Sequence, residues 1–335
     1  MSRPPLTARR LALLVGLAGL LFLSAALLCP LFGAESLDWA AALAGRGAAG
    51  TIFYFQRLPR VLLGLLAGGG LALAGASFQA ILRNPLATPY TLGVSGASAL
   101  GASLALWIPA LSARLGPLSG PALAAWAFAL AEVALVDRLA RAKGGGGLQG
   151  ETLLLAGVTL GLVSSAAILG VRYLVSPDLL VEMDRWLMGG LTVGGWSEPA
   201  AVLPLLLPSA AVLLLSAREF NHLAFGEETA RARGVEPGRV RRRAFLAGSL
   251  ATASVVSVTG PIGFVGLLVP HAVRLLIGPD HRALLPCSFL AGGALLAWCD
   301  TLARTAAAPT EIPVGLFTAL LGGPLFLWLL LRGKG

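Results

Sequence analysis

The sequence predicts an all-α membrane protein whose helices cross a lipid bilayer many times. Hydrophobic residues make up 56% of the chain and charged residues only 12%, which is about half the charged share of a soluble domain. The mean hydropathy is +0.82. Apolar runs of about 20 residues recur along the 335-residue chain. Each run is long enough as a helix to cross a hydrocarbon core of about 30 Å.

The apolar runs predict about ten transmembrane helices in one transmembrane domain that covers residues 1–335. The stretches between them are polar or contain glycine and proline, where turns are expected. The eighth run is the least sharply bounded. The predicted helices cover residues 11–32, 57–82, 90–108, 119–138, 152–175, 197–217, 240–259, 263–278, 283–302 and 313–332.

The net charge of +9 is explained by membrane topology rather than by nucleic-acid binding. With the amino terminus inside, most lysines and arginines fall in cytoplasmic loops, as the positive-inside rule predicts. Both termini are then cytoplasmic. The first run, Leu11–Leu28, follows basic residues as a signal peptide does. It is longer than a signal core and no clear cleavage site follows, so we interpret it as a retained span.

Two proline- and glycine-containing stretches break the helical pattern. Pro85 and Pro89 in "RNPLATPY" stop the second span at the inner face. The stretch "TGPIGFVGLLVPHAVR" lies at or near the outer face. Each break is followed by three more spans, which is the pattern of an inverted repeat that relates helices two to five to helices seven to ten. Small residues spaced three and four apart in Gly64–Ser77 predict close approach of helix backbones.

The sequence carries no catalytic or metal-binding pattern. It has no nucleotide-binding G-x-x-x-x-G-K-[ST] loop, and its histidines and three cysteines show no metal-ligand spacing. Glu132, Asp137 and Asp300 fall near the ends of predicted spans, which weakens a proton- or sodium-driven mechanism. The energy for transport is therefore expected to come from another polypeptide. A secondary transporter that works alone is the alternative.

Four segments then occur in the order and spacing of one known family. They are "RLPRVLLGLLAGGGLALAGASFQAILRNPLATPYTLGVSGA", "FGEETARARGV", "GPIGFVGLLVPHAVRLL" and "EIPVGLFTALLGGPLFLWLLL". Together they resemble the permease subunits of ABC importers for iron-siderophores, haem and cobalamin, the type II importers. The resemblance covers nearly the whole chain, from Leu11 to Arg332.

The resemblance implies a permease domain that pairs with a second copy of itself around a substrate path. Two cytoplasmic ATPase subunits would carry the ATP and magnesium, and a periplasmic binding protein would deliver the cargo. This chain would bind no cofactor, would not itself be an enzyme, and would lie in a bacterial inner membrane. Siderophore, haem and cobalamin cargoes are not distinguished. Neighbouring genes for an ATPase and a binding protein would exclude the secondary-transporter alternative.

A polar island, Phe220–Arg243, interrupts the apolar pattern. Its part at about 218–238 resembles the family's coupling segment, whose short helices fit a groove of the ATPase. Acidic residues begin the predicted helix and basic residues end it, which matches the helix dipole, and a glycine stops it. Arg241–Arg243 is interpreted as a topogenic run that holds the loop inside. The predicted coupling residues are Leu223, Ala224, Phe225, Gly226, Glu227, Glu228, Ala230, Arg231 and Gly234.

The resemblance also implies two further sites. Arg57, Arg60 and Arg304 match outer-face arginines that meet acidic residues of the binding protein, with interfacial snorkelling as the alternative. Asn84 and Leu86 match residues that line the inner constriction of the substrate path. The family also places small hydroxyl residues before the fifth span, where this chain has Gly150 and Glu151, so the inner gate departs from the family pattern there.

Overall fold

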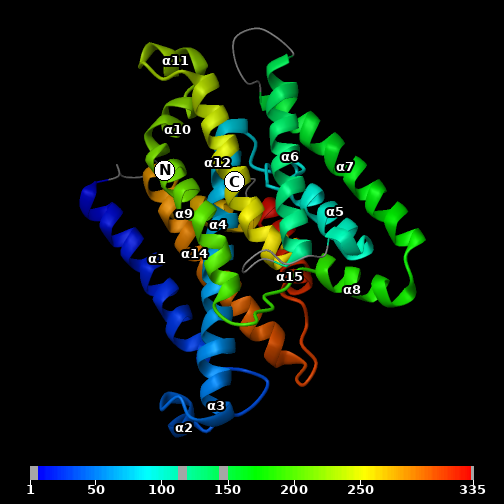
Figure 1. Cartoon of the computed structure of the whole chain (residues 1–335). Helices are drawn as coiled ribbons and strands as arrows, with labels where there is room; N and C mark the ends of the chain where they lie inside the picture. The colour runs from blue at the N-terminus through cyan, green and yellow to red at the C-terminus, as the bar shows by residue number, and fades with distance from the viewer. Residues whose placement is uncertain (1–6, 112–118, 143–149, 333–335) are drawn as a thin grey trace.

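The computed structural model describes residues 7–111, 119–142 and 150–332. These residues form helices and connections without any strand, which confirms the predicted all-α class (Figure 1). The helices are α1 (Ala8–Leu28), η1 (Cys29–Leu31), α2 (Trp39–Leu43), α3 (Gly47–Thr51), η2 (Ile52–Arg57), α4 (Leu58–Leu82), α5 (Val94–Trp107), η3 (Pro109–Leu111), α6 (Gly120–Ala142), α7 (Gly150–Leu174), α8 (Pro177–Leu187), α9 (Ser197–Leu215), α10 (Ala217–Ala224), α11 (Glu227–Ala232), α12 (Pro237–Thr259), α13 (Val265–Ile277), α14 (His281–Ala306) and α15 (Val314–Arg332).

Each predicted span overlaps one long helix: α1, α4, α5, α6, α7, α9, α12, α13, α14 or α15. Five helical stretches in the described part of the chain are long and apolar enough to cross a membrane by length and composition. Helices α5 and α13 and the stretch Val314–Trp328 of α15 are apolar but shorter. The number of spans and the inverted repeat therefore stay predictions.

Helix α4 lies at the centre of the bundle, where nearly all of its residues are buried. It crosses α14 at Gly68 and Gly292. A Cβ atom on Gly292 would lie 2.5 Å from both the Gly68 carbonyl oxygen and the Ala72 Cβ. The two backbones therefore touch directly, as the small residues of Gly64–Ser77 predict. Such close approach is the main source of helix association where lipid removes the hydrophobic drive.

The bundle has two distinct ends (Figure 1). Helices α10 and α11 project from one end, here called the α11 end. Helices α2 and α3 lie at the other, here called the α2–α3 end. Sequence periodicity does not predict α2, α3 or α8, because helices of five to eleven residues are too short to show an apolar run of membrane-spanning length.

Candidate functional site

Two short helices form the segment for which the sequence predicts coupling. Helix α11 begins with Glu227 and Glu228 and carries Arg231 in its last turn, so its charges complement the helix dipole. Gly234 follows with φ of 76°, a left-handed conformation that glycine adopts without strain. The helix thus begins and ends as the sequence predicts.

The exposed surface of this segment is apolar and charged, because Arg231 and Arg233 are exposed as well as Glu228. Phe225, between the two helices, is 72% exposed, and Ala224 and Glu228 are exposed beside it. Leu223 and Ala230, which the sequence includes among the coupling residues, are buried. Both side chains anchor the segment to the hydrophobic core, so the apolar contact face predicted for Ala230 is not exposed in this chain. The docking role of the exposed residues stays a prediction.

The first break in the helical pattern lies at the same end, directly after α4. Arg83 caps α4 with φ of 49°, two residues before Pro85. Asn84 Oδ1 accepts a hydrogen bond from the backbone N–H of Leu86 at 2.9 Å. Asn84 therefore shapes the turn, whereas the exposed Leu86 side chain is the one available to narrow a path.

The two breaks lie against each other inside the bundle. Residues of 88–90 and of 262–267 line one cavity of about 220 Å³, together with Leu71 in the middle of α4. The residues from Ile262 to Leu267 therefore extend toward the middle of α4, and the predicted place of the second break at or near the outer face stays a prediction. Gly75 and Gly266 carry no side chains, so the second break packs directly on the α4 backbone. Breaks that meet inside a bundle are typical of transporter substrate paths.

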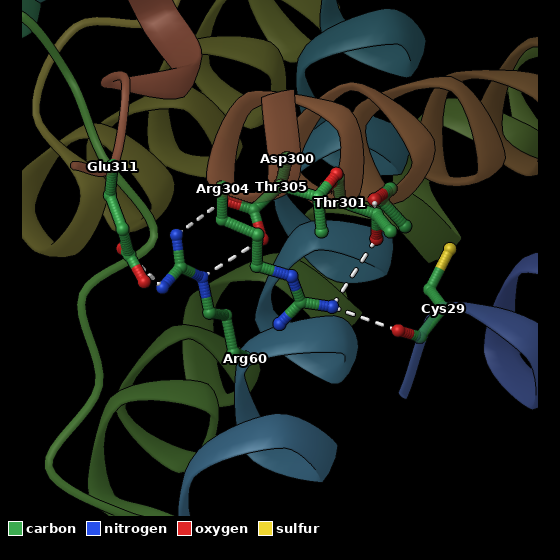
Figure 2. Close-up of polar contacts among 8 residues, drawn as sticks. Cys29, Arg60, Asp300, Thr301, Arg304, Thr305 and Glu311 are labelled. Carbon is green, nitrogen blue, oxygen red and sulfur yellow. Dashed lines mark hydrogen bonds and ion pairs between the residues drawn. The ribbon is translucent and has the colours of Figure 1, made fainter. Parts of the chain in front are cut away.

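The arginines predicted to dock a binding protein lie at the α2–α3 end, and Figure 2 shows two of them. Arg60 donates two hydrogen bonds of 2.9 Å to the Asp300 carboxylate. It donates a third, of 2.8 Å, to Glu311. Arg304 donates to the Cys29 carbonyl oxygen at 2.8 Å. These contacts tie α4, α14 and the chain after α1 into one network.

The exposed position that the sequence predicts for these arginines is wrong for two of them. Arg57 and Arg304 are only 5% and 3% exposed. The physical reason is that each guanidinium donates to carbonyl groups of its own chain; Arg57, for example, donates to Leu31 at 3.2 Å and to Glu35 at 2.5 Å. Arg60 retains a partly exposed side chain. A docking role for the three arginines stays a prediction.

Sequence periodicity misses one amphipathic helix that borders a cavity. Glu182, Arg185 and Trp186 of α8 line a cavity of about 480 Å³. Its other walls come from α5, α12, the start of α6 and the chain that follows α8. The available signal was the alternation of apolar and charged residues at helical spacing in "PDLLVEMDRWL". Such a helix lies beside a bundle rather than across a membrane.

The position predicted for the acidic residue Glu132 is wrong. The sequence predicts it near the end of a span, but it lies buried in the middle of α6. Its carboxylate lies against Gly93, which directly precedes α5 with φ of 81° and where a side chain would have no room. The described residues contain no group of three or more His, Cys, Asp or Glu side chains that could hold a metal ion.

A bundle of apolar helices, with two breaks that meet inside it and an exposed helix pair at one end, defines a membrane-transport permease. Comparison with known families agrees with this class. The chain belongs to the FecCD transport family, which matches residues 15–332. The resemblance to ABC-importer permeases is thereby confirmed.

Individual relatives match along most of their length. The cobalamin import system permease protein BtuC of Halobacterium salinarum is 45% identical over 82% of this chain and 72% of its own. The hemin transport system permease protein HmuU of Yersinia pestis is 41% identical, over 83% and 82%. The ferric enterobactin transport system permease protein FepD of Escherichia coli is 39% identical over 93% of both chains. A solved inward-facing structure of a metal-chelate type ABC transporter has a TM-score of 0.83 at 30% identity, covering 96% of this chain and 99% of that one.

Proposed function

We propose that this chain is the membrane subunit of an ABC importer for a large metal chelate, either an iron-siderophore, haem or cobalamin, in a bacterial inner membrane. The family match over residues 15–332 carries the proposal. Relatives named for cobalamin, hemin and ferric enterobactin support this class of cargo. All three cargoes are metal complexes much larger than a single ion, so they require a wide path.

In this proposal two copies of the chain enclose the path and two ATPases bind at the α11 end, which faces the cytoplasm with both termini. Leu155, Leu162 and Leu169 lie seven residues apart on α7 and are all exposed, so one face of α7 is open to a second copy or to lipid. ATP and magnesium bind to the ATPases, and this chain supplies the path.

A periplasmic binding protein docks at the α2–α3 end in this proposal. Of the three arginines there, Arg60 is the one whose side chain reaches the surface, together with its exposed partner Glu311. Charged groups at such a rim act mainly on the rate of association. Arg57 and Arg304 contribute by holding this end in shape.

The docking surface is tested by the double change Phe225→Asp and Glu228→Lys. Both side chains are exposed, and both changes oppose the surface that α11 offers to an ATPase. We expect the purified variant to lose co-purification with the ATPase while its thermal unfolding stays unchanged. Asp178→Lys, in the first turn of α8, makes the same acid-to-base change on a distant helix and serves as the control. Full ATPase association of the double variant would reject this docking surface.

Uptake into proteoliposomes tests the cargo and the mechanism together. The complete transporter, with ATPase and binding protein, is offered a ferric siderophore, haem and cobalamin in turn. We expect uptake of one of them, dependent on internal ATP, by a particle with two copies of this chain per two ATPases. Uptake by the chain alone along an ion gradient would instead support the secondary-transporter alternative.

A further inference from the structure

The run Arg241–Arg243 at the start of α12 contacts three separate elements. Arg241 binds Glu227 of α11, Arg242 binds Asp137 of α6, and Arg243 binds Glu219 of α10. A purely topogenic run needs only to be positive and on the cytoplasmic side. Three successive arginines with three carboxylates from different helices show a more specific arrangement.

Arg241 is the most deeply placed of the three, with 11% of its side chain exposed. Its Nη2 atom donates to Glu227 Oε1 at 2.5 Å, and its Nε atom donates to the backbone carbonyl oxygen of Ile81 at 3.2 Å. Ile81 belongs to the last turn of α4, directly before the turn that contains Asn84. One guanidinium therefore connects α11 to the end of α4.

The chemistry at this position suits arginine better than lysine. A guanidinium presents several N–H donors in a rigid plane, so it can hold a carboxylate and a carbonyl oxygen at the same time, whereas an ammonium acts as a single point charge. The positive charge also lies at the carboxyl end of α4, where the helix dipole favours a cation. The hydrogen bond from Arg241 is the largest cause that holds the pKa of Glu227 below its usual range.

We propose that Arg241 is a positioning residue that transmits movement of α11 to the end of α4 and the adjacent turn at 84–86. Arg242 holds the start of α12 to α6, and Arg243 holds it to α10. In this proposal α11 moves relative to the start of α12, which these two contacts keep in place. This inference rests on the proposed function, in which ATPases bind at the α11 end, and on the inner constriction that the sequence predicts at Asn84 and Leu86. Its expected effect is on the coupling of ATP hydrolysis to transport.

The test compares Arg241→Gln, Arg241→Lys and Glu227→Gln in the complete transporter in proteoliposomes. Arg239→Gln is the control, because Arg239 is exposed and lies outside this cluster. ATPase co-purification, cargo-stimulated ATP hydrolysis and cargo uptake are measured on the same preparations. We expect Arg241→Gln to keep ATPase association and hydrolysis while uptake per ATP falls about tenfold, within the usual range of coupling free energies. Arg241→Lys should recover part of this loss.

Because both changes break one contact, the double variant with Glu227→Gln should lose no more coupling than Arg241→Gln alone. Unchanged uptake per ATP in Arg241→Gln, with ATPase association intact, would overturn the inference and leave the proposed function standing. Loss of ATPase association in Arg241→Gln would also overturn it, since Arg241 would then only hold α11 in its docking shape. Failure of the wild-type chain to bind an ATPase would overturn the proposed function itself.

Discussion

The ion pair between Arg60 and Asp300 allows a quantitative test of what the outer arginines do. The Asp300 side chain is 3% exposed and the Arg60 side chain 16%, so both groups are largely removed from solvent. Removing one partner of a buried pair costs about 3–5 kcal/mol, because the other charge is left unpaired. Arg60 keeps its bond to the exposed Glu311, so we expect Asp300→Ala to cost about 3 kcal/mol, at the lower end of that range.

The measurement is unfolding of the purified chain from mild detergent by increasing dodecyl sulfate, followed by circular dichroism. Asp184→Ala is the matched control, since Asp184 pairs with Arg172 where both side chains are about one-third exposed, and such pairs contribute about 0–1 kcal/mol. Replacing both members of the buried pair, as Arg60→Met with Asp300→Leu, should restore most of the lost stability, because no unpaired charge remains. If Asp300→Ala is no more destabilising than Asp184→Ala, the arginine network has no structural role and the reasoning fails.

Two further predictions concern packing and pH. Gly292→Leu should destabilise the chain by about 1–3 kcal/mol or more through overpacking against Gly68, whereas Gly16→Leu, which meets open space on α1, should be neutral in the same unfolding assay. The hydrogen bond from Arg282 lowers the pKa of Asp280, the residue that caps α14, from 3.8 to about 2. A lowered carboxyl pKa stabilises the fold above the unfolded value and loses that contribution as the pH falls through the folded one. The difference in unfolding midpoint between wild type and Asp280→Asn should thus be constant above pH 5 and vanish between pH 4 and pH 2; a constant difference at all pH values would contradict this.

Much of the fold follows from local sequence patterns. The long helices are predictable because length and apolar composition decide whether a segment crosses a membrane. The break at Pro85 and the helix that begins at Glu227 are predictable because proline, the charges of the terminal helix turns and the glycine after the helix act locally. The membrane family is likewise readable from ordered motifs, and its match over residues 15–332 confirms it.

The side-chain partners were not predictable, because they depend on contacts between distant positions. Arg60 and Asp300 are 240 positions apart, and nothing near either residue indicates the other. The same holds for Arg241 and Ile81, which are 160 positions apart. An arginine beside a predicted span end has the same sequence signature whether it faces solvent or a buried carboxylate.

The contacts at both ends of the bundle make α4 and α14 behave as one unit. Their backbones touch at mid-length through Gly68 and Gly292, and the Arg60–Asp300 pair joins them at the α2–α3 end. At the α11 end, Asn221 of α10 donates to Asp280, the cap of α14, at 2.8 Å. The end of α4 is bound there by α12.

Close-packed helices resist shear between their backbones, because small relative shifts create overlaps or voids. Helices α4 and α14 are joined at mid-length and at one end, and neighbouring elements hold them at the other end. They are therefore expected to move together more readily than to slide past each other. The α10–α11 helix pair contacts both members, through Asn221 for α14 and, for α4, through Glu227, which binds Arg241 of α12. The break around Pro85 directly follows α4. Movement that begins at α11 is thus expected to displace this turn relative to the α4–α14 pair. A gate on the substrate path would have to act at this turn.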